Sequence, residues 1–326
     1  MLGFRGLAVP DWLRSFAAEY GLGGVILFDR DVQLGGIRNV ESPAQVRALC
    51  SEVHALPSRP LVFVDQEGGK VRRLKPGAGF KELPSARAFA ALPEPEARRL
   101  ALASFAEMKE LGFDFDLAPV VDLDTNPDNP NIGKLERAYS ADAREVRRCA
   151  RILNEAARAV GLGLCVKHFP GLGGARTDSH LALTDLSGLV SPEQEQLFYE
   201  LAGELSGGAA LFSHGFVREW DASLPASISP AAVARFRAAQ PETLLITDDI
   251  QMQGLQGAAG SVDAVMRALR AGIDLVCVGN NLLAQADECV EAARSLCERA
   301  QRDAAFAAQL AASRGRIAAR KRFAAR

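Results

Sequence analysis

The sequence lacks the charge excess that is typical of proteins that bind nucleic acids or membrane surfaces. Its 326 residues carry 38 Lys and Arg against 40 Asp and Glu, for a net charge of -2. Proteins that bind the phosphate groups of nucleic acids or of membrane lipids usually show a basic excess. The one clearly basic stretch, residues 314–326, has the spacing of one face of a terminal helix, and we expect that face to be solvated. We therefore expect neither nucleic acid nor membrane among the partners.

Long apolar runs and a secretory leader are also missing. No run reaches the ~18 apolar residues that a membrane-spanning helix requires, and residues 1–6 lack a charged region followed by an apolar core. The six cysteines form no C-x-x-C pair, and Cys165 and Cys277 lie inside apolar runs, where cysteine behaves as a small buried hydrophobic residue. Because this usage suits a reducing compartment, we expect a cytoplasmic protein.

Common cofactor and nucleophile motifs are absent as well. The chain has no phosphate loop of the G-x-x-x-x-G-K-S/T type, and Gly171-Leu172-Gly173-Gly174 fails the dinucleotide pattern. No Ser-His-Asp order with a nucleophile elbow occurs. We expect no cofactor.

Short apolar runs alternate with longer segments of helical periodicity along the whole chain. The runs predict strands at 24–28, 61–64, 113–121, 162–166, 209–212, 243–246 and 273–278, with residues 1–6 as an eighth. The intervening segments predict helices at 42–56, 93–111, 141–160, 191–205, 229–239, 261–271 and 282–299. This alternation indicates a parallel sheet with crossover helices, either a (β/α)8 TIM barrel or a doubly wound open sheet. With no linker or repeat visible, we expect a single domain over residues 1–326.

Nearly every predicted strand ends in a polar or charged residue, which favours the barrel. Barrel active sites are assembled from the carboxyl ends of several strands, whereas an open sheet concentrates its site at one switch point. A barrel therefore brings the following residues to one rim: Asp65, Arg73, Asp122, Arg137, Lys167, His168, Asp178, His180, His214, Asp248 and Asp249.

The stretch from Lys167 to His180 holds the densest set of such groups. Pro170 and the glycines that follow it exclude a helix, so a tight loop is expected after the strand. Within it, Asp178 stands two residues before His180 and is able to orient its imidazole, as in a catalytic dyad. The alternative is that Asp178 caps the next helix and His180 is a solvated loop residue.

Two further strand ends carry carboxylates. Asp248 and Asp249 follow an apolar run directly, and two adjacent acids cannot both be buried without partners. We expect Asp248 to face the site and Asp249 to have a structural role; the alternative for the pair is a helix N-cap. Asp65, with Arg73 nearby, is able to bind vicinal hydroxyls, unless these charges only form surface pairs.

These motifs, taken together and in this order, resemble glycoside hydrolase family 3, specifically its short bacterial β-N-acetylglucosaminidases of peptidoglycan recycling. The resemblance covers nearly the whole chain and rests on the segments at 24–28, 64–69, 118–122, Lys167-His168-Phe169-Pro170-Gly171, Asp178-Ser179-His180 and Asp248-Asp249.

The resemblance implies a retaining double displacement that releases terminal GlcNAc from muropeptides or related β-glycosides. It assigns Asp248 as the nucleophile, His180 as the general acid/base and Asp178 as its dyad partner. The expected partner is a carbohydrate, the expected state a monomer, and no metal is required. The residues that match the family's sugar contacts are Asp65, Arg73, Arg137, Lys167 and His168.

Two positions depart from the family pattern, and other functions compete with the first. Leu172 stands where the family commonly has His, and Gly174 where a polar residue is often found. The competing functions are a β-glucosidase or broader β-glycosidase, a phosphorolytic variant, a catalytically silent sugar-binding protein, and a metal-dependent hydrolase that uses His168, His180 and His214.

Overall fold

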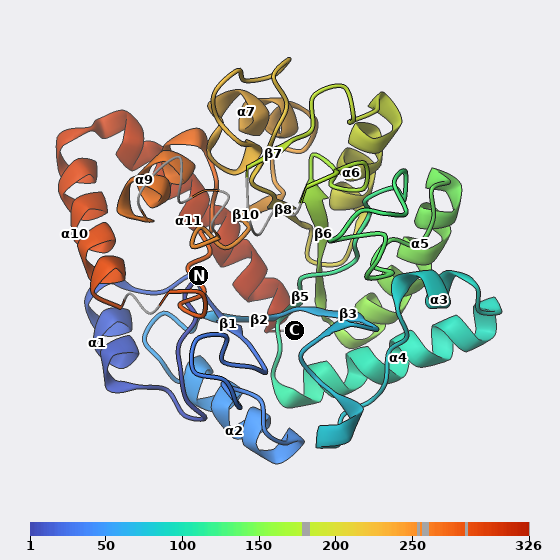
Figure 1. Cartoon of the computed structure of the whole chain (residues 1–326). Coiled ribbons are helices and arrows are strands. Elements are labelled where there is room, and N and C mark those ends of the chain that lie inside the picture. Colours follow the sequence, from blue (N-terminus) through green and yellow to red (C-terminus); the bar gives the residue numbers. More distant parts are fainter. Residues whose placement is uncertain (178–182, 253–254, 256–260, 284–285, 326) are drawn as a thin grey trace.

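Six short parallel strands form the central sheet of the molecule (Figure 1). The computed structural model describes residues 1–177, 183–252, 255, 261–283 and 286–325. The strands lie in the order β1 (Gly24–Leu27), β2 (Leu61–Val64), β5 (Phe115–Asp116), β6 (Gly163–Phe169), β8 (Ala209–Phe212) and β10 (Leu244–Thr247). This order follows the chain, as expected for successive right-handed crossovers.

Isolated parallel bridges continue the arc beyond its two edges. Leu275 bridges Ile246 of β10, and Leu2 bridges both Val278 and Val25 of β1. The result is a TIM-barrel-like α/β fold whose regular sheet covers only part of the ring. The predicted strands 273–278 and 1–6 therefore join the ring through isolated bridges, two in each segment, rather than as regular strands, partly because Cys277 donates its N–H to the Thr247 hydroxyl (2.9 Å) instead of to a neighbouring strand.

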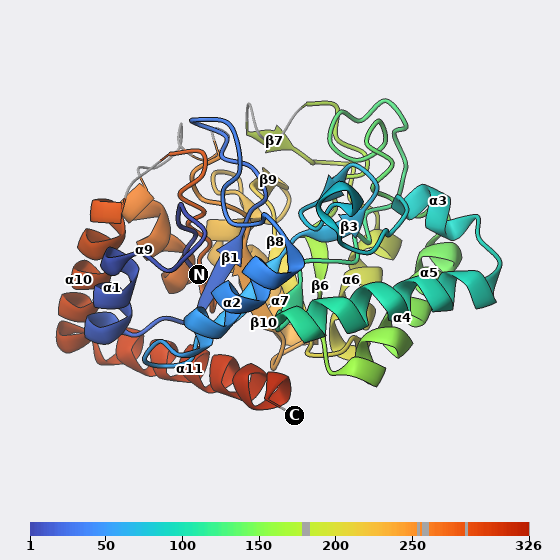
Figure 2. The same ribbon diagram turned by 90° about the horizontal axis from the view of Figure 1, so that it is seen from below.

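Helices surround the sheet on its outside, except for the last one, which runs across one end of the sheet (Figure 1 and Figure 2). They are α1 (Asp11–Tyr20), α2 (Pro43–His54), α3 (Ala86–Ala90), α4 (Glu94–Leu111), α5 (Ala143–Val160), α6 (Pro192–Glu204), α7 (Pro230–Ala239), α9 (Ser261–Ala271), α10 (Ala286–Arg302) and α11 (Ala304–Ala324). The predicted helices are confirmed, whereas α1 and α3 were not predicted. Among the described residues, no helix is long and apolar enough to cross a membrane.

Three of the helices start with the same Ser-Pro pair. The hydroxyls of Ser42, Ser191 and Ser229 each accept the N–H three residues ahead, and proline occupies the first helical position. Such a cap is worth ~1 kcal/mol, and proline has no N–H to leave unsatisfied there. At the other end, Gly112 and Gly161 close α4 and α5 in the left-handed conformation that glycine adopts without strain.

Short additional elements stand on the carboxyl side of the strands. They are an antiparallel pair, β3 (Gln66–Gly68) with β4 (Val71–Arg72), a parallel pair, β7 (Thr184–Asp185) with β9 (Gly215–Phe216), and the 3₁₀ turns η1 (Pro76–Ala78) and η2 (Ala226–Ile228). Figure 2 shows β3, β7 and β9 together at one edge of the molecule. This is the edge to which the sequence assigned the site.

Two predicted strand boundaries were wrong. The strand expected at 113–121 is reduced to β5, because Pro119 has no N–H for a sheet hydrogen bond; only Val120 still bridges Lys167 farther along. The strand expected at 162–166 instead continues to Phe169. Lys167 and His168 therefore belong to β6 itself, and the loop begins after them.

Helix α11 closes the opposite end of the sheet (Figure 2). Phe323 packs near Phe115, with ring centroids 6.4 Å apart, and Ala324 belongs to the cluster of apolar side chains inside the arc. Arg320 donates to the carbonyls of Gly208 and Glu242, which precede β8 and β10. The basic stretch 314–326 is therefore not simply solvated, because part of it binds the exposed ends of the sheet.

Candidate active site

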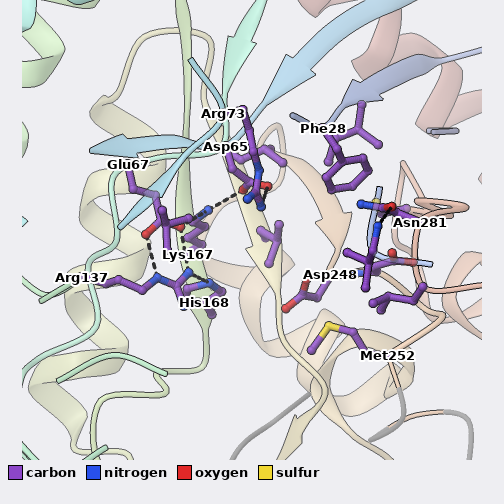
Figure 3. Close-up of a pocket in the computed structure, with 18 of the residues that line it drawn as sticks. Phe28, Asp65, Glu67, Arg73, Arg137, Lys167, His168, Asp248, Met252 and Asn281 are labelled. Atoms are coloured by element: carbon purple, nitrogen blue, oxygen red, sulfur yellow. Dashed lines mark hydrogen bonds and ion pairs between the residues drawn. The ribbon is translucent and has the colours of Figure 1, made fainter. Parts of the chain in front are cut away.

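A cavity of about 390 Å³ opens at the carboxyl ends of the strands (Figure 3). Asp65 follows β2, Lys167 and His168 lie at the end of β6, and Asp248 follows β10; all line the cavity. In the view of Figure 3, charged side chains occupy one side, Phe28 and Met252 the other, and Asp248 lies between them. The volume is in the range of small-molecule sites.

Lys167 lies between two carboxylates on the charged side. Its ammonium is 2.7 Å from Oδ1 of Asp65 and 2.5 Å from Oε1 of Glu67, and its side chain is 2% exposed. Burial lowers the pKa of Lys167, but Asp65 and Glu67 outweigh it and raise the pKa above its usual value. An ammonium has three donors. The two contacts therefore leave one donor for a ligand.

Arg137 and Glu67 form a buried bidentate pair. Nε and Nη2 of Arg137 donate to the two carboxylate oxygens of Glu67 at 2.7 and 2.8 Å. Burial raises the pKa of Glu67, but Arg137 and Lys167 more than compensate and lower it to about 2. Glu67 is thus the common anionic partner of two cations in the site.

Arg73 and Asp65 retain unused hydrogen-bonding capacity. Nη2 of Arg73 donates to Oδ2 of Asp65 at 3.2 Å, its guanidinium lies 5.6 Å from the centroid of the Phe28 ring, and its buried Nε has no partner among the described residues. Burial raises the pKa of Asp65, yet Lys167 and Arg73 hold it well below its usual range. A carboxylate has about four acceptor sites. Asp65 therefore remains able to accept from ligand hydroxyls.

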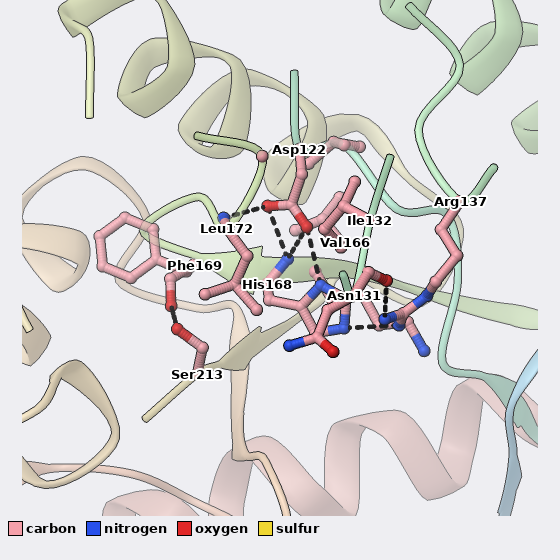
Figure 4. Close-up of polar contacts among 12 residues, drawn as sticks. Asp122, Asn131, Ile132, Arg137, Val166, His168, Phe169, Leu172 and Ser213 are labelled. Carbon is pink, nitrogen blue, oxygen red and sulfur yellow. Dashed lines mark hydrogen bonds and ion pairs between the residues drawn. The ribbon is translucent and has the colours of Figure 1, made fainter. Parts of the chain in front are cut away.

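His168 is fixed from both sides of its ring (Figure 4). Nδ1 lies 2.8 Å from Oδ2 of Asp122, and Nε2 lies 2.9 Å from Nη2 of Arg137. Asp122 is fully buried and also accepts the backbone N–H groups of His168 (3.2 Å) and Leu172 (2.9 Å). Asp122 thereby links the end of β6 to the loop that follows it.

The Asp248 carboxylate differs from those of Asp65 and Glu67 because it has no cation partner among the described residues. Its Oδ1 accepts the N–H of Asp249 at 2.9 Å, and its own N–H donates to the carbonyl of Phe212 at 2.8 Å. Within the described part of the chain, no Lys or Arg lies within ion-pair distance of this carboxylate. An unpaired carboxylate at a cavity surface is available to react with a bound ligand.

Asp249 also lines the cavity, but its carboxylate is held by the backbone. Oδ1 accepts the N–H groups of Gln251 and Gly279, both at 3.1 Å, and burial raises its pKa to about 6. A Cβ at Gly279 would lie 2.3 Å from Oδ2 of Asp249, so only glycine fits there. Nε2 of His214 is 2.9 Å from the Asp249 carbonyl. Asp249 therefore orients the segment that carries Asp248.

Asp116 lies buried next to this network. Its Oδ1 accepts the N–H of Gln66 at 2.9 Å, whereas Oδ2 has no partner in the described structure. Burial raises the pKa of Asp116 to about 7. Asp116 is therefore a carboxyl group that gains a proton readily near neutral pH.

The model of the glycosyl hydrolase family 3 N-terminal domain matches residues 2–309. This chain belongs to glycoside hydrolase family 3. Among curated members, the beta-hexosaminidase of Thiobacillus denitrificans is 33% identical over 293 residues, which cover 86% of this chain and 78% of that protein.

Two solved structures share the fold. A beta-N-acetylhexosaminidase from Beutenbergia cavernae superposes with a TM-score of 0.84 at 26% identity, over 98% of this chain and 96% of that one. A beta-N-acetylglucosaminidase from Paenibacillus sp. gives a TM-score of 0.84 at 27% identity over 100% of this chain. The chain spans 61% of that longer protein.

The structure brings together the described residues that the family 3 resemblance assigned. Those lining the cavity are Asp65, Arg73, Arg137, Lys167, His168 and Asp248. Asp178 and His180 lie outside the described residues. Glu67 was not predicted as a site residue, although it occurs in the motif at 64–69; Asp122 was expected at the rim but was given no role. The sequence showed a carboxylate in each motif but not its partner. That partner is Arg137 for Glu67, 70 positions away, and His168 for Asp122, 46 positions away.

Leu172, at a position where family 3 commonly has His, has an apolar environment. Its side chain is 2% exposed and packs in a small cluster with Val120, Ile132 and Leu186. A Cβ on the next residue, Gly173, would lie 1.7 Å from the carbonyl oxygen of Leu123. Packing and close backbone approach therefore determine this part of the loop.

The metal-dependent alternative required His168 and His214 to act as ligands. His168 bonds Asp122 and Arg137, and His214 bonds Ser227 (2.7 Å) and the Asp249 carbonyl. Among the described residues, no three His, Cys, Asp or Glu side chains are grouped so as to hold a metal ion. Both imidazoles are instead committed to hydrogen bonds.

Proposed function

We propose that this protein is a retaining β-N-acetylglucosaminidase that removes terminal GlcNAc from β-glycosides. The observation that carries the proposal is the Asp248 carboxylate, which has no cation partner in the described part of the chain and shares one cavity with an array of charged donors and acceptors. Family membership supports glycoside hydrolysis, and the names of the curated and solved relatives support the N-acetylated sugar.

The charged side of the cavity has the chemistry needed to bind sugar hydroxyls. Lys167 and Arg73 retain donors, and Asp65 retains acceptor sites. Hydrogen bonds to charged groups contribute ~1.5–3 kcal/mol each when both partners are satisfied. Arg137 and His168 complete this side, and Glu67 holds two of its cations in place.

The proposed reaction is a double displacement. Asp248 attacks the anomeric carbon while the bond to the leaving oxygen breaks, and His180 gives its proton to that oxygen. In the second step, His180 takes a proton from water, the water oxygen bonds to the anomeric carbon, and the ester to Asp248 breaks. Asp178 orients the imidazole in both steps.

The first test measures hydrolysis of 4-nitrophenyl β-N-acetylglucosaminide and of the corresponding β-glucoside. We expect a higher kcat/KM for the N-acetyl sugar, and a first-formed β-anomer by proton NMR because the mechanism retains configuration. A preference for the glucoside would instead support a β-glucosidase, and turnover that requires inorganic phosphate would support phosphorolysis.

The second test concerns the nucleophile. Asp248→Ala should lose at least ~10³-fold in kcat, whereas Asp263→Ala, on the exposed side of α9, should retain full activity. A 5-fluoro glycoside should label a peptide that contains Asp248, as detected by mass spectrometry. Full activity of Asp248→Ala would overturn the assignment, and binding without turnover in the unmodified protein would indicate a silent sugar-binding protein.

We also propose that residues 1–326 form one closed (β/α)8 catalytic domain, monomeric, that acts in the cytoplasm on muropeptides from peptidoglycan recycling. The bridges of Leu2 and Leu275 support closure, and the packing of α11 under the strands supports a single domain. All six cysteines are free thiols, which suits a reducing compartment. Sedimentation equilibrium and hydrolysis of purified muropeptides test the state and the substrate.

A further inference from the structure

The loop between β1 and α2 exposes a cluster of apolar side chains. Within residues 29–38, here called the rim loop, Val32 is 58% exposed, Leu34 74% and Ile37 58%. Single exposed apolar residues are common on protein surfaces and need no explanation. Three apolar residues in one loop, each more than half exposed, do require an explanation.

The rim loop is held in place by a buried ion pair rather than by its apolar residues. The Asp31 carboxylate accepts Nη1 of Arg38 at 3.0 Å and the N–H groups of Gln33 (3.1 Å) and Leu34 (2.8 Å). The Arg38 side chain is 1% exposed, and its Nη2 donates to the carbonyl of Asn280 at 2.5 Å. The buried Arg38 therefore fixes the loop to the segment that contains Asn280.

A second anchor is Asn281, which follows the segment of isolated bridges at residues 275–278. Oδ1 of Asn281 accepts the N–H of Val32, and Nδ2 of Asn281 donates to the carbonyl of Arg30, both at 3.0 Å. The Asp31 carboxylate and the backbone of Arg30 and Val32 thus bond inward, while the side chains of Val32, Leu34 and Ile37 are exposed. Such an arrangement presents an apolar surface of defined shape.

The rim loop lies next to the catalytic cavity. Val32 and Leu282 both line the cavity, and Gln33 bonds the Leu282 carbonyl at 2.9 Å. Figure 2 shows the loop, in blue after β1, at the same edge of the molecule as β3 and β7. Leu34 and Ile37 are exposed in the same loop, two and five positions after Val32.

We propose that Val32, Leu34 and Ile37 form a binding surface for the leaving group of the substrate, which selects β-glycosides whose aglycone has an apolar face. The inference rests on the proposed function. The charged side of the cavity offers donors and acceptors for sugar hydroxyls, whereas Val32, Leu34 and Ile37 add exposed apolar side chains to a rim loop whose Asp29 and Arg30 also line the cavity. An apolar aglycone that buries part of these side chains gains affinity in proportion to the area removed from water.

The test compares hexyl and methyl β-N-acetylglucosaminide, because both release a simple alcohol of similar leaving ability and differ mainly in apolar area. We expect the unmodified protein to show a kcat/KM about tenfold higher for the hexyl glycoside. In the variant Val32→Ser/Leu34→Ser/Ile37→Ser this ratio should fall close to one. The matched control is Leu102→Ser, which changes an apolar residue that is 45% exposed on α4, outside the rim loop. The ratio for this control should equal that of the unmodified protein.

The outcomes separate the inference from the function on which it rests. Equal ratios for the unmodified protein and the triple variant overturn the inference, as does concentration-dependent self-association that the triple variant abolishes without changing the ratio, because the surface then serves a second copy. If neither glycoside is hydrolysed, the proposed function fails. The ratio of their dissociation constants, measured by calorimetry on the same proteins, still decides the inference.

Discussion

Arg137 places a guanidinium N–H 2.9 Å from Nε2 of His168. A guanidinium can only donate, so Nε2 must be the acceptor. Nδ1 then carries the proton and donates to Asp122 at 2.8 Å. Two partners from different parts of the chain thus fix His168 as the neutral Nδ1–H tautomer, with both ring nitrogens occupied by the protein.

This relationship predicts the NMR spectrum of His168. In ¹⁵N-labelled protein at pH 7, we expect the ring to show a protonated Nδ1 and an unprotonated Nε2. Arg137→Met should remove the constraint on Nε2 and allow the other tautomer. A protonated Nε2 in the unmodified protein would contradict the hydrogen-bond pattern.

Asp122 should contribute strongly to stability. It is fully buried and accepts from the backbone of His168 and Leu172 as well as from the imidazole. Asp122→Ala leaves these donors unsatisfied and should lower the free energy of unfolding by about 3 kcal/mol, measured by urea denaturation. Asp263→Ala removes an exposed i,i+4 pair and should cost less than ~0.5 kcal/mol. Similar losses in both variants would show that Asp122 is not a structural centre.

Glu67 should affect binding more than chemistry. Glu67→Gln removes the charge that holds Lys167 and Arg137, so we expect KM for the aryl glycoside to rise about 10–100-fold with a smaller change in kcat. Glu82→Gln, which changes a residue 69% exposed and paired with Arg72, is the control and should leave both constants unchanged. An unaltered KM in Glu67→Gln would refute this role.

Asp116 should make stability depend on pH between about 4 and 7. Its pKa is raised to about 7 by burial, against ~3.9 in an unfolded chain, so the folded state holds a proton that the unfolded state has lost. The free energy of unfolding therefore falls as pH rises through this window. Asp116→Asn lacks this pH-dependent loss and should gain on the order of 4 kcal/mol relative to the unmodified protein by pH 7.

The measurement is urea denaturation of both proteins from pH 4 to 8, with Asp263→Asn as a surface control. The difference between Asp116→Asn and the unmodified protein should grow with pH and then level off above about pH 7. A difference that is constant over the whole range would mean that Asp116 ionises as readily in the folded chain as in the unfolded one.

Chelators should leave activity unchanged. The imidazoles of His168 and His214 are engaged by Asp122, Arg137, Ser227 and the Asp249 carbonyl. We expect the same kcat/KM before and after dialysis against EDTA. Loss of activity that Zn²⁺ restores would reinstate the metal-dependent alternative.

The alternation of strands and helices could be predicted from the sequence alone, and with it the edge at which polar residues gather. Local rules suffice here, because hydrophobic period and Ser-Pro starts act over a few residues. They placed Asp65, Lys167 and Asp248 at strand ends, and the order of the motifs indicated the family. The structure is consistent with all three positions.

Which charged side chains meet could not be predicted from the sequence, because it depends on the three-dimensional fold. Glu67 pairs with Arg137 across 70 positions, and His168 with Asp122 across 46. Such contacts depend on how neighbouring strands align and which side chains are desolvated together, neither of which a local pattern encodes. The same reason explains why residues 273–278 and 1–6 join the ring through isolated bridges rather than as regular strands. It also explains why α11 binds the sheet with residues that were expected to be solvated.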